Sequence, residues 1–233
     1  MNNAYKKFGY FYDEIMACVN YDLWLEFTTT FLKKGDSVLD LACGTGTFCT
    51  LLTLNGYHAD GIDLSETSIE IAKEKKKLNR MDINYTVCDM TKFKTKKKYD
   101  VITCYFDSMN FLSSKKLIQR MLKCVAKSLK KGGFFLCDIF SKEMLKEYTN
   151  NEMHEDYETF KIDWYTKKIN DTTLHHDITI HDGDEDIKET YDEYYYEIED
   201  LKNRKLKLIQ KSGDFNNDLQ DQDERILLVF QRK

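Results

Sequence analysis

The 233-residue sequence contains no proline, no Cys-x-x-Cys pair and no apolar run near the roughly 20 residues that a membrane span needs. Without proline, its turns depend on glycine, asparagine and aspartate. The first residues, MNNAYKKFGYFYDE, include two lysines but no apolar signal core. These absences predict a protein that is neither secreted nor membrane-spanning.

The cysteines give no sign of a disulfide framework. There are seven of them, an odd number. Cys43, Cys88, Cys104 and Cys137 lie inside apolar, strand-like runs, where cysteine behaves as a small hydrophobic residue. This usage favours a reducing compartment, and we expect a cytoplasmic protein.

The charge is not that of a typical nucleic-acid binder, because the formal net charge is -5 and phosphate neutralisation requires a basic face. The lysine clusters at 73–77 and 94–98 are short, and we interpret them as solvated surface. A small-molecule partner is therefore expected, although an RNA acceptor stays open, as does the oligomeric state.

Apolar strands alternate with helical patterns along most of the chain. The strand-like runs are VLDLAC, HADGID, INYTVCDM, DVITCYF and GFFLCDIF, and LKLI and RILLVF follow near the end. Continuous apolar strands separated by helices predict a parallel sheet that is covered on both faces. We expect an α/β domain of seven strands over residues 36–150 and 198–233.

Residues 151–197 have a different pattern. The runs FKIDWYTKKI, TLHHDITIH and IKETYDEYYY look extended, with turn residues at Asn170-Asp171 and Asp182-Gly183. They predict an inserted three-stranded antiparallel β cap, followed by a short helix at EIEDLKNR. We interpret His175, His176 and His181 as surface residues of this cap and predict no metal site.

Residues 1–35 read as helical and aromatic. Tyr12, Tyr21 and Trp24 recur near helical spacing. Such a stripe is compatible with core packing or with a lid whose rings cover a cationic ligand. Both alternatives remain open at this point.

The glycine turn in VLDLACGTGTF, residues 38–48, marks the expected ligand site at the end of the first strand. A P-loop requires Gly-Lys-Ser/Thr, but Gly46 is followed by Thr47 and Phe48. A dinucleotide fingerprint requires a third glycine or alanine, but that position is Cys49. A pyrophosphate would also lie close to the Asp40 carboxylate, which its charge disfavours.

A sulfonium cofactor fits this turn better than a phosphate. S-adenosylmethionine carries an ammonium group and a sulfonium at one end and no phosphate, so Asp40 suits it. The next strand ends at Asp63, which can accept hydrogen bonds from ribose hydroxyls. The third ends at Asp89 and Met90, where a carboxylate and a backbone N–H can contact an adenine edge.

Together, VLDLACGTGTF, GIDLS, the acidic CDM and LKKGGFFLCDIF resemble the successive motifs of class I S-adenosylmethionine-dependent methyltransferases over roughly residues 36 to 140. The resemblance implies a Rossmann-like, mostly parallel seven-stranded sheet with an antiparallel last strand, and S-adenosyl-L-methionine as cofactor, released as S-adenosyl-L-homocysteine. The residues predicted on the cofactor side are Tyr12, Tyr21, Trp24, Asp40, Ala42, Gly44, Thr45, Gly46, Asp63, Leu64, Asp89, Met90 and Tyr105.

A narrower resemblance links the chain to a bacterial group of small uncharacterised methyltransferases with a β insertion after the fifth strand. It rests on F-x-Y-x-Y-D-x-x-M and Y-x-x-W near the start and on D-S-x-N at residues 107–110. Relatives carry a His- and Arg-containing stretch before the helix after the insertion. Here that stretch is shortened to YDEYYYEIEDL and contains neither His nor Arg, so the resemblance implies no acceptor-binding His or Arg there.

The predicted function is in-line transfer of a methyl group to a nucleophile on an acceptor. Asp107 is the candidate base or acceptor-binding residue, and Asn110 is the candidate orienting residue. Two alternatives are a module that binds the cofactor without turnover and a nicotinamide-dependent oxidoreductase. The attacking atom is left open by the sequence.

Overall fold

The computed structural model describes residues 7–216 and 218–233, so the first six residues of the expected lid at 1–35 lie outside the described part. Two sheets organise the chain. The strands of the main sheet are β1 Ser37–Leu41, β2 His58–Asp63, β3 Asn84–Val87, β4 Tyr99–Cys104, β5 Leu129–Phe140, β10 Leu206–Gly213 and β11 Arg225–Arg232. The helices are α1 Gly9–Ile15, α2 Tyr21–Thr29, α3 Thr47–Leu54, α4 Glu66–Leu78, α5 Lys115–Ser128 and α6 Lys142–Glu147.

The main sheet has the strand order β10-β11-β5-β4-β1-β2-β3. The pairs among β1 to β5 are parallel, and β11 is antiparallel to both of its neighbours. This confirms the predicted Rossmann-like sheet with an antiparallel last strand. The chain order reverses between β1 and β4, and the carboxyl ends of these strands are where such sheets bind ligands.

Each face of the main sheet carries its own apolar core. Successive side chains of a strand point to opposite faces, so Val38 and Leu39 of β1 belong to different clusters. The cluster around Val38 includes residues of α2, α3 and α4, whereas that around Leu39 includes residues of α5. The sheet is therefore covered on both sides, as the apolar strands predicted.

The insertion forms a four-stranded antiparallel sheet, one strand more than predicted. Its strands are β6 Asn151–Asp156, β7 Lys161–Asn170, β8 Thr173–Asp182 and β9 Glu185–Tyr194, paired in that order. The extra strand, β6, pairs with β7 at the edge of the sheet and is exposed at almost every position. Its sequence therefore lacks the apolar alternation from which the other three were predicted.

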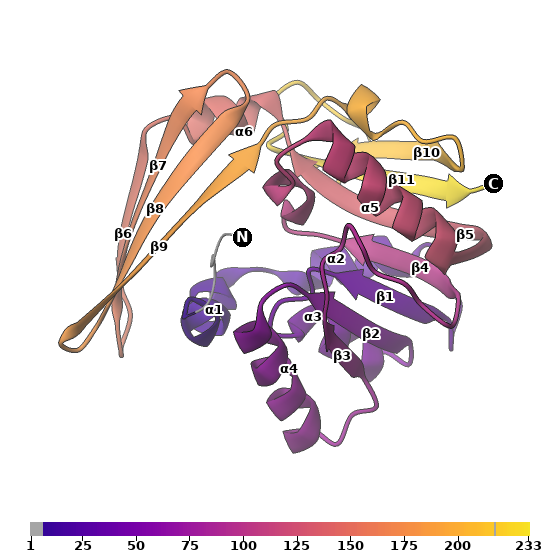
Figure 1. Cartoon of the computed structure of the whole chain (residues 1–233), viewed down its shortest axis with the longest axis horizontal. Helices are drawn as coiled ribbons and strands as arrows, with labels where there is room; N and C mark the ends of the chain where they lie inside the picture. Colours follow the sequence, from indigo (N-terminus) through magenta and orange to yellow (C-terminus); the bar gives the residue numbers. More distant parts are fainter. Residues whose placement is uncertain (1–6, 217) are drawn as a thin grey trace.

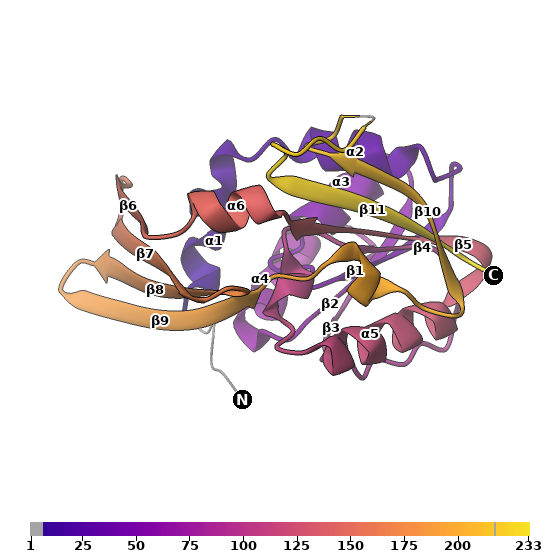
Figure 2. The same ribbon diagram turned by 90° about the horizontal axis from the view of Figure 1, so that it is seen from above.

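Helix α1 lies between the cap sheet and the main sheet (Figures 1 and 2). The backbone N–H groups of Lys7 and Phe8 donate to Oε1 of Glu189 on β9, at 2.9 and 3.1 Å. On its other side α1 approaches α4 closely, because a Cβ at Gly9 would lie 3.1 Å from Oγ of Ser68. The N-terminal segment thus connects the two sheets.

The prediction of a helix at EIEDLKNR is wrong. The chain makes a short 3-10 turn, η3 Ile198–Leu201, which a capping box formed by Glu197 and Asp200 begins. Asn203 then pairs with Leu206 as the chain enters β10. A segment this short gains too few hydrogen bonds to offset the cost of starting an α-helix.

No helix in the described residues is long and apolar enough to cross a membrane.

Candidate active site

The turn between β1 and α3 has left-handed backbone at three positions, with φ of 55° at Ala42, 53° at Gly44 and 81° at Gly46. At Gly46, a Cβ would lie 2.7 Å from Cζ of Tyr85, so no larger residue fits. At Gly44 the added Cβ would make only an ordinary contact, and the positive φ is what favours glycine. The turn therefore presents bare backbone at the carboxyl end of β1.

Asp40 is a buried carboxyl group, 4% exposed, in β1 next to this turn. Its Oδ1 accepts a hydrogen bond from Oγ1 of Thr103 at 2.6 Å, and its Oδ2 lies 3.8 Å from Sγ of Cys49. Burial raises its pKa to about 7, although these two bonds oppose the shift, and the nearby charge of Asp63 adds to it. No cationic side chain of the described residues lowers the Asp40 pKa, so the ionised carboxylate would lack a counter-charge.

Asp63, at the end of β2, faces the same turn. Its Oδ2 accepts from the backbone N–H of Gly44 and its Oδ1 from that of Ser65, both at 2.8 Å. Burial raises its pKa, while backbone N–H groups of Ser65, Gly44 and Leu64 oppose the shift. The Leu64 side chain is 65% exposed beside it. The carboxylate thus fixes the glycine turn against β2.

Asp89, after β3, takes part in a local turn. Its Oδ1 accepts from the backbone N–H and the hydroxyl of Thr91, both at 2.7 Å, and Lys92 pairs with it at 2.9 Å. Burial would raise its pKa, but the bonds from Lys92 and Thr91 outweigh it and lower the pKa. Met90 packs against the core beside α5. The adenine contact of Asp89 and Met90 stays a prediction.

Helix α1 covers the glycine turn. Cε1 of Tyr12 lies 3.7 Å from where a Cβ of Gly44 would be, and burial, with the charges of Tyr21, Asp63, Asp13 and Asp40, raises the Tyr12 pKa. This position agrees with the lid alternative for Tyr12.

Asp13 holds the lid in place. Its Oδ1 accepts from the Thr45 hydroxyl at 2.5 Å and from the Thr47 hydroxyl at 3.3 Å. Its Oδ2 forms an ion pair with Lys75 of α4 at 2.8 Å. Asp13 and Lys75 were not predicted as site residues from the sequence, although Asp13 belongs to the F-x-Y-x-Y-D motif.

The aromatic residues of α2 pack at the end of β4. The Trp24 ring stacks on Phe106 with centroids 4.4 Å apart, and its Nε1 donates to Oδ2 of Asp138 at 3.3 Å. The hydroxyl of Tyr105 lies 2.7 Å from Oγ1 of Thr28 in the core. Core packing thus describes the side chains of Trp24 and Tyr105 better than a lid. Their cofactor contacts stay predictions.

Arg225 pairs with two buried carboxylates, that of Asp107 after β4 and that of Asp138 in β5. Its Nη1 and Nη2 donate to the two oxygens of Asp107 at 2.7 and 2.9 Å, and Nη1 also donates to Oδ2 of Asp138 at 2.8 Å. Asp138 accepts in addition from the backbone N–H groups of Phe106 and Asp107, at 3.2 and 3.0 Å. Burial raises the pKa of Asp107, Arg225 opposes this, and Asp138 and Glu193 add to it.

Asp138 and Arg225 were not among the site residues predicted from the sequence. One signal was present, because Asp138 is the single charged residue in the apolar run GFFLCDIF, within β5. Arg225 had no comparable signal at the start of β11. Since Arg225 holds both oxygens of Asp107, that carboxylate is engaged in fixing the turn after β4.

Asn110 connects this turn to the cap. It lies in the 3-10 turn η2 Ser108–Phe111, is fully buried, and donates from Nδ2 to the backbone carbonyl of Tyr194 at 2.8 Å. His176, predicted at the surface, is instead 3% exposed on the inner face of the cap. It shares this buried face of β8 with the apolar Leu174 and Ile178, while the residues between them are more exposed. In the described ranges, no group of three or more His, Cys, Asp or Glu could hold a metal ion.

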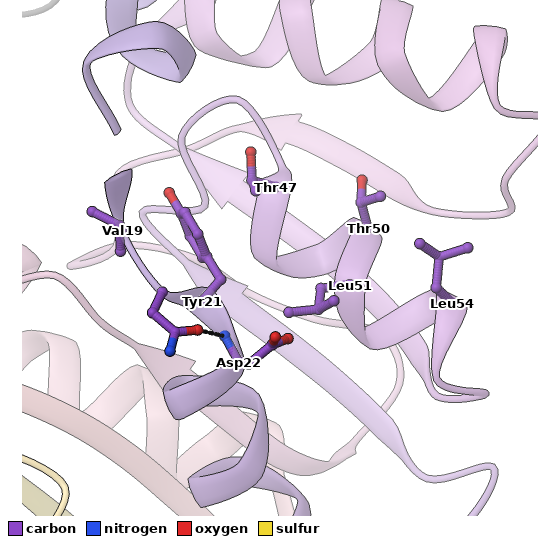
Figure 3. Close-up of a pocket in the computed structure, with 8 residues that line it drawn as sticks. Val19, Tyr21, Asp22, Thr47, Thr50, Leu51 and Leu54 are labelled. Carbon is purple, nitrogen blue, oxygen red and sulfur yellow. Dashed lines mark hydrogen bonds between the residues drawn. The ribbon is translucent and has the colours of Figure 1, made fainter. Parts of the chain in front are cut away.

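A cavity of about 300 Å³ opens beside α3, but none of these carboxylates lines it. Figure 3 shows Tyr21, Thr47 and Thr50 on its wall, with Val19 and Leu54 at its ends. Tyr21 is the one predicted site residue that lines it. We therefore place the candidate site at the strand ends, where the acidic groups converge, and not in this cavity.

Comparison with known proteins indicates the class of protein to which the chain is similar. Residues 38–133 match the family described as a methyltransferase domain. The putative methyltransferase YqeM of Bacillus subtilis (strain 168) is 27% identical over a 241-residue alignment that covers 98% of this chain and 97% of that protein. A putative methyltransferase of Geobacillus sp. (strain WCH70) is 30% identical over 143 residues, and this match spans 58% of that protein's length.

A solved structure is also similar over nearly the whole chain. The crystal structure of an S-adenosylmethionine-dependent methyltransferase from Clostridium acetobutylicum ATCC 824 has 27% identity and a TM-score of 0.84, and the match covers 98% of each chain. With the strand order and the glycine turn, these similarities define a class I S-adenosylmethionine-dependent methyltransferase with S-adenosylmethionine as its cofactor. Within that class, the chain is similar along its length to small bacterial proteins such as YqeM.

Proposed function

We propose that this protein transfers the methyl group of S-adenosylmethionine to a nucleophile on a small-molecule acceptor. The observation that carries the cofactor side is Asp40, a buried acid with a raised pKa and no cationic partner in the described chain. A positively charged ligand end beside Gly44 would compensate this charge, whereas a pyrophosphate would be repelled by it. The Asp40 carboxyl group and the bare backbone at Gly44 therefore fit the cationic end of the cofactor.

Each strand end has a separate role in holding the cofactor. Asp40 and the backbone at Gly44 bind the methionine end, Asp63 accepts from the ribose hydroxyls, and Asp89 with Met90 binds the adenine. Tyr12 covers the turn and excludes water. When bound, S-adenosylmethionine supplies an activated methyl group on its sulfonium, so the chain needs no covalent intermediate.

The chain's main contribution is to orient the acceptor, because alignment of the reacting atoms alone is worth several kcal/mol. The cap and α1 stand over the carboxyl edge of the main sheet (Figure 1), which supports a small acceptor over a large folded RNA. Asp107 contributes by fixing the turn after β4, because Arg225 occupies both of its oxygens. Asn110 links that turn to the cap.

A calorimetric titration tests the cofactor half of this proposal. We expect micromolar binding of S-adenosylmethionine and no binding of NADH or NADPH, and the reverse result would overturn the proposal. An acceptor screen that measures S-adenosylhomocysteine formation, with metabolite mixtures and deproteinised RNA as separate arms, tests the other half. Cofactor binding without turnover in every arm would indicate a binding module instead.

A further inference from the structure

A buried histidine and a glutamate lie side by side on the inner face of the cap. His176 accepts at Nδ1 from Nε1 of Trp164, which lies at 3.0 Å, and the Thr166 hydroxyl is also 3.0 Å from Nδ1. A tryptophan N–H can only donate, so Nδ1 carries no proton and neutral His176 carries its proton on Nε2. That Nε2 lies 3.2 Å from Oε2 of Glu193. His176 thus presents an N–H to the glutamate and restricts where its carboxylate lies.

Two buried polar atoms at this junction, one of them in the pair itself, lack a well-aligned hydrogen bond. Nε2 of His176 approaches Glu193 off the direction of a hydrogen bond, and Oδ1 of Asn110 has no partner among the described groups. The orientation of the Asn110 amide is determined, because its other end faces the Tyr194 carbonyl and must be the NH2 group. Oδ1 is therefore a buried acceptor that requires a donor.

The charges around this junction favour the same kind of ligand. Glu193 is close enough to Asp107 that its charge raises the pKa of that carboxyl group, and Asp138 lies behind it. In the described chain Asp107 and Asp138 both pair with Arg225, whereas Glu193 faces His176, so these three carboxylates outnumber the one guanidinium among them. Hydrogen-bond acceptors and negative charge together suit a cationic donor.

Aromatic rings line the same junction. His176 stacks on Tyr191 with centroids 4.6 Å apart, and Tyr191 lies 5.0 Å from Phe111 of η2. These packed rings bury the junction and exclude water from it. The junction of η2 with β9 therefore combines a carboxylate, an unpaired carbonyl oxygen and aromatic rings.

We propose that the methyl acceptor is an amine, which binds as an ammonium ion between Oδ1 of Asn110 and the Glu193 carboxylate. Glu193, positioned by His176, takes one proton from it. The nitrogen lone pair then forms the N–C bond as the bond from the methyl carbon to sulfur breaks, and sulfur keeps that electron pair as a thioether. The product is a methylammonium ion, and the proton on Glu193 passes to solvent. This inference rests on the proposed methyl-transfer function.

Matched pairs of acceptors test the substrate class. Tyramine, glucosamine and ethanolamine are compared with tyrosol, glucose and ethylene glycol, first by calorimetric binding to the enzyme saturated with S-adenosylhomocysteine and then by turnover. We expect binding and methylation within the amine group only. An enzyme that binds S-adenosylmethionine but binds the hydroxyl compounds as well as, or better than, every amine overturns the inference and leaves the proposed function intact. Failure to bind S-adenosylmethionine contradicts the proposed function itself.

Two neighbouring acids of β9 provide a matched comparison. Glu193→Gln should weaken binding of the best amine about ten- to a hundredfold, because a charge-assisted hydrogen bond is lost. Asp192→Asn, on the opposite face where the residue contacts His175, should change it less than about twofold. Affinity for S-adenosylmethionine should stay unchanged in both. Equal amine affinities of the two variants would contradict the role of Glu193.

A rescue experiment separates positioning by His176 from a structural role. His176→Gln keeps an acceptor for Trp164 and a donor for Glu193, whereas His176→Leu keeps neither. We expect the glutamine variant to retain amine affinity within about fivefold and the leucine variant to lose about tenfold or more. Equal losses in both, with cofactor affinity retained, would show that His176 does not act through its hydrogen bonds.

Discussion

Two aspartates are buried at the carboxyl ends of the adjacent strands β1 and β4, yet only one has a cationic partner in the described chain. Arg225 donates to both oxygens of Asp107. Asp40 accepts from the neutral Thr103 hydroxyl and Cys49 thiol. The difference indicates that the chain neutralises the β4 end itself and leaves the β1 end to its ligand. Substitutions at these positions should distinguish a structural acid, Asp107, from a ligand-binding one, Asp40.

The largest effect is expected from removing the internal cation. Arg225→Met leaves Asp107 and Asp138 buried without a counter-charge, which should cost about 3–5 kcal/mol of the free energy of unfolding. Denaturant unfolding measures this loss. Arg120→Met, at an exposed position of α5, is the control and should change stability by less than about 0.5 kcal/mol. Similar stabilities of the two variants would remove the basis for the comparison.

Asp40 should behave in the opposite way in the ligand-free protein. Burial raises its pKa from 3.8 to about 7, so between these pH values the folded state holds a proton that the unfolded state has released. Stability should therefore fall as the pH rises through this window. Asp40→Asn keeps the bond to Thr103 and should recover up to about 4 kcal/mol above pH 7, with no gain near pH 4. If Asp40→Asn were less stable than wild type at pH 8, this would contradict the conclusion that Asp40 lacks a cationic partner.

Asp63 should affect the ligand more than the fold. Asp63→Ala removes a carboxylate that is proposed to accept from two ribose hydroxyls, so affinity for S-adenosylmethionine should fall about a hundredfold. Calorimetry measures the affinity, and thermal unfolding checks that the fold remains intact. Asp82→Ala, at an exposed position before β3, provides the control. Unchanged affinity in Asp63→Ala would show that the ribose assignment is wrong.

The smallest effect concerns the lid. Asp13→Asn weakens the ion pair with Lys75. Because the Asp13 side chain is 44% exposed, this ion pair contributes at most about 1 kcal/mol to holding α1 in place. We expect the Kd for S-adenosylmethionine to rise no more than about fivefold, mainly through faster dissociation. Asp22→Asn, near the start of α2, should leave the dissociation rate unchanged. A slower release from Asp13→Asn would contradict the role of α1 as a cover.

The sequence was most informative where contacts are local. The strand, the glycine turn and Asp40 occur within nine residues of each other, and Asp63 ends the next strand, so motif spacing alone predicted that these groups meet at the strand ends. The seven-stranded sheet followed from apolar runs that are buried on both faces.

Contacts between distant parts of the chain were not predictable in this way. Arg225 and Asp107 are 118 residues apart, and nothing in the sequence near either residue indicates the pair. His176 looked like a surface histidine because its partners, Trp164 and Glu193, meet it only after three strands have paired. Strand β6 was missed because an exposed edge strand needs no apolar alternation.

Proton release on cofactor binding tests the central claim most directly. At pH 6.5, calorimetric titrations of S-adenosylmethionine in buffers of different ionisation enthalpy give the number of protons released per molecule bound. Because ligand-free Asp40 is largely protonated below its pKa of about 7, a cation bound beside it should release a large part of one proton. The account predicts that wild type releases this proton and that Asp40→Asn does not. Equal release from both proteins would contradict it.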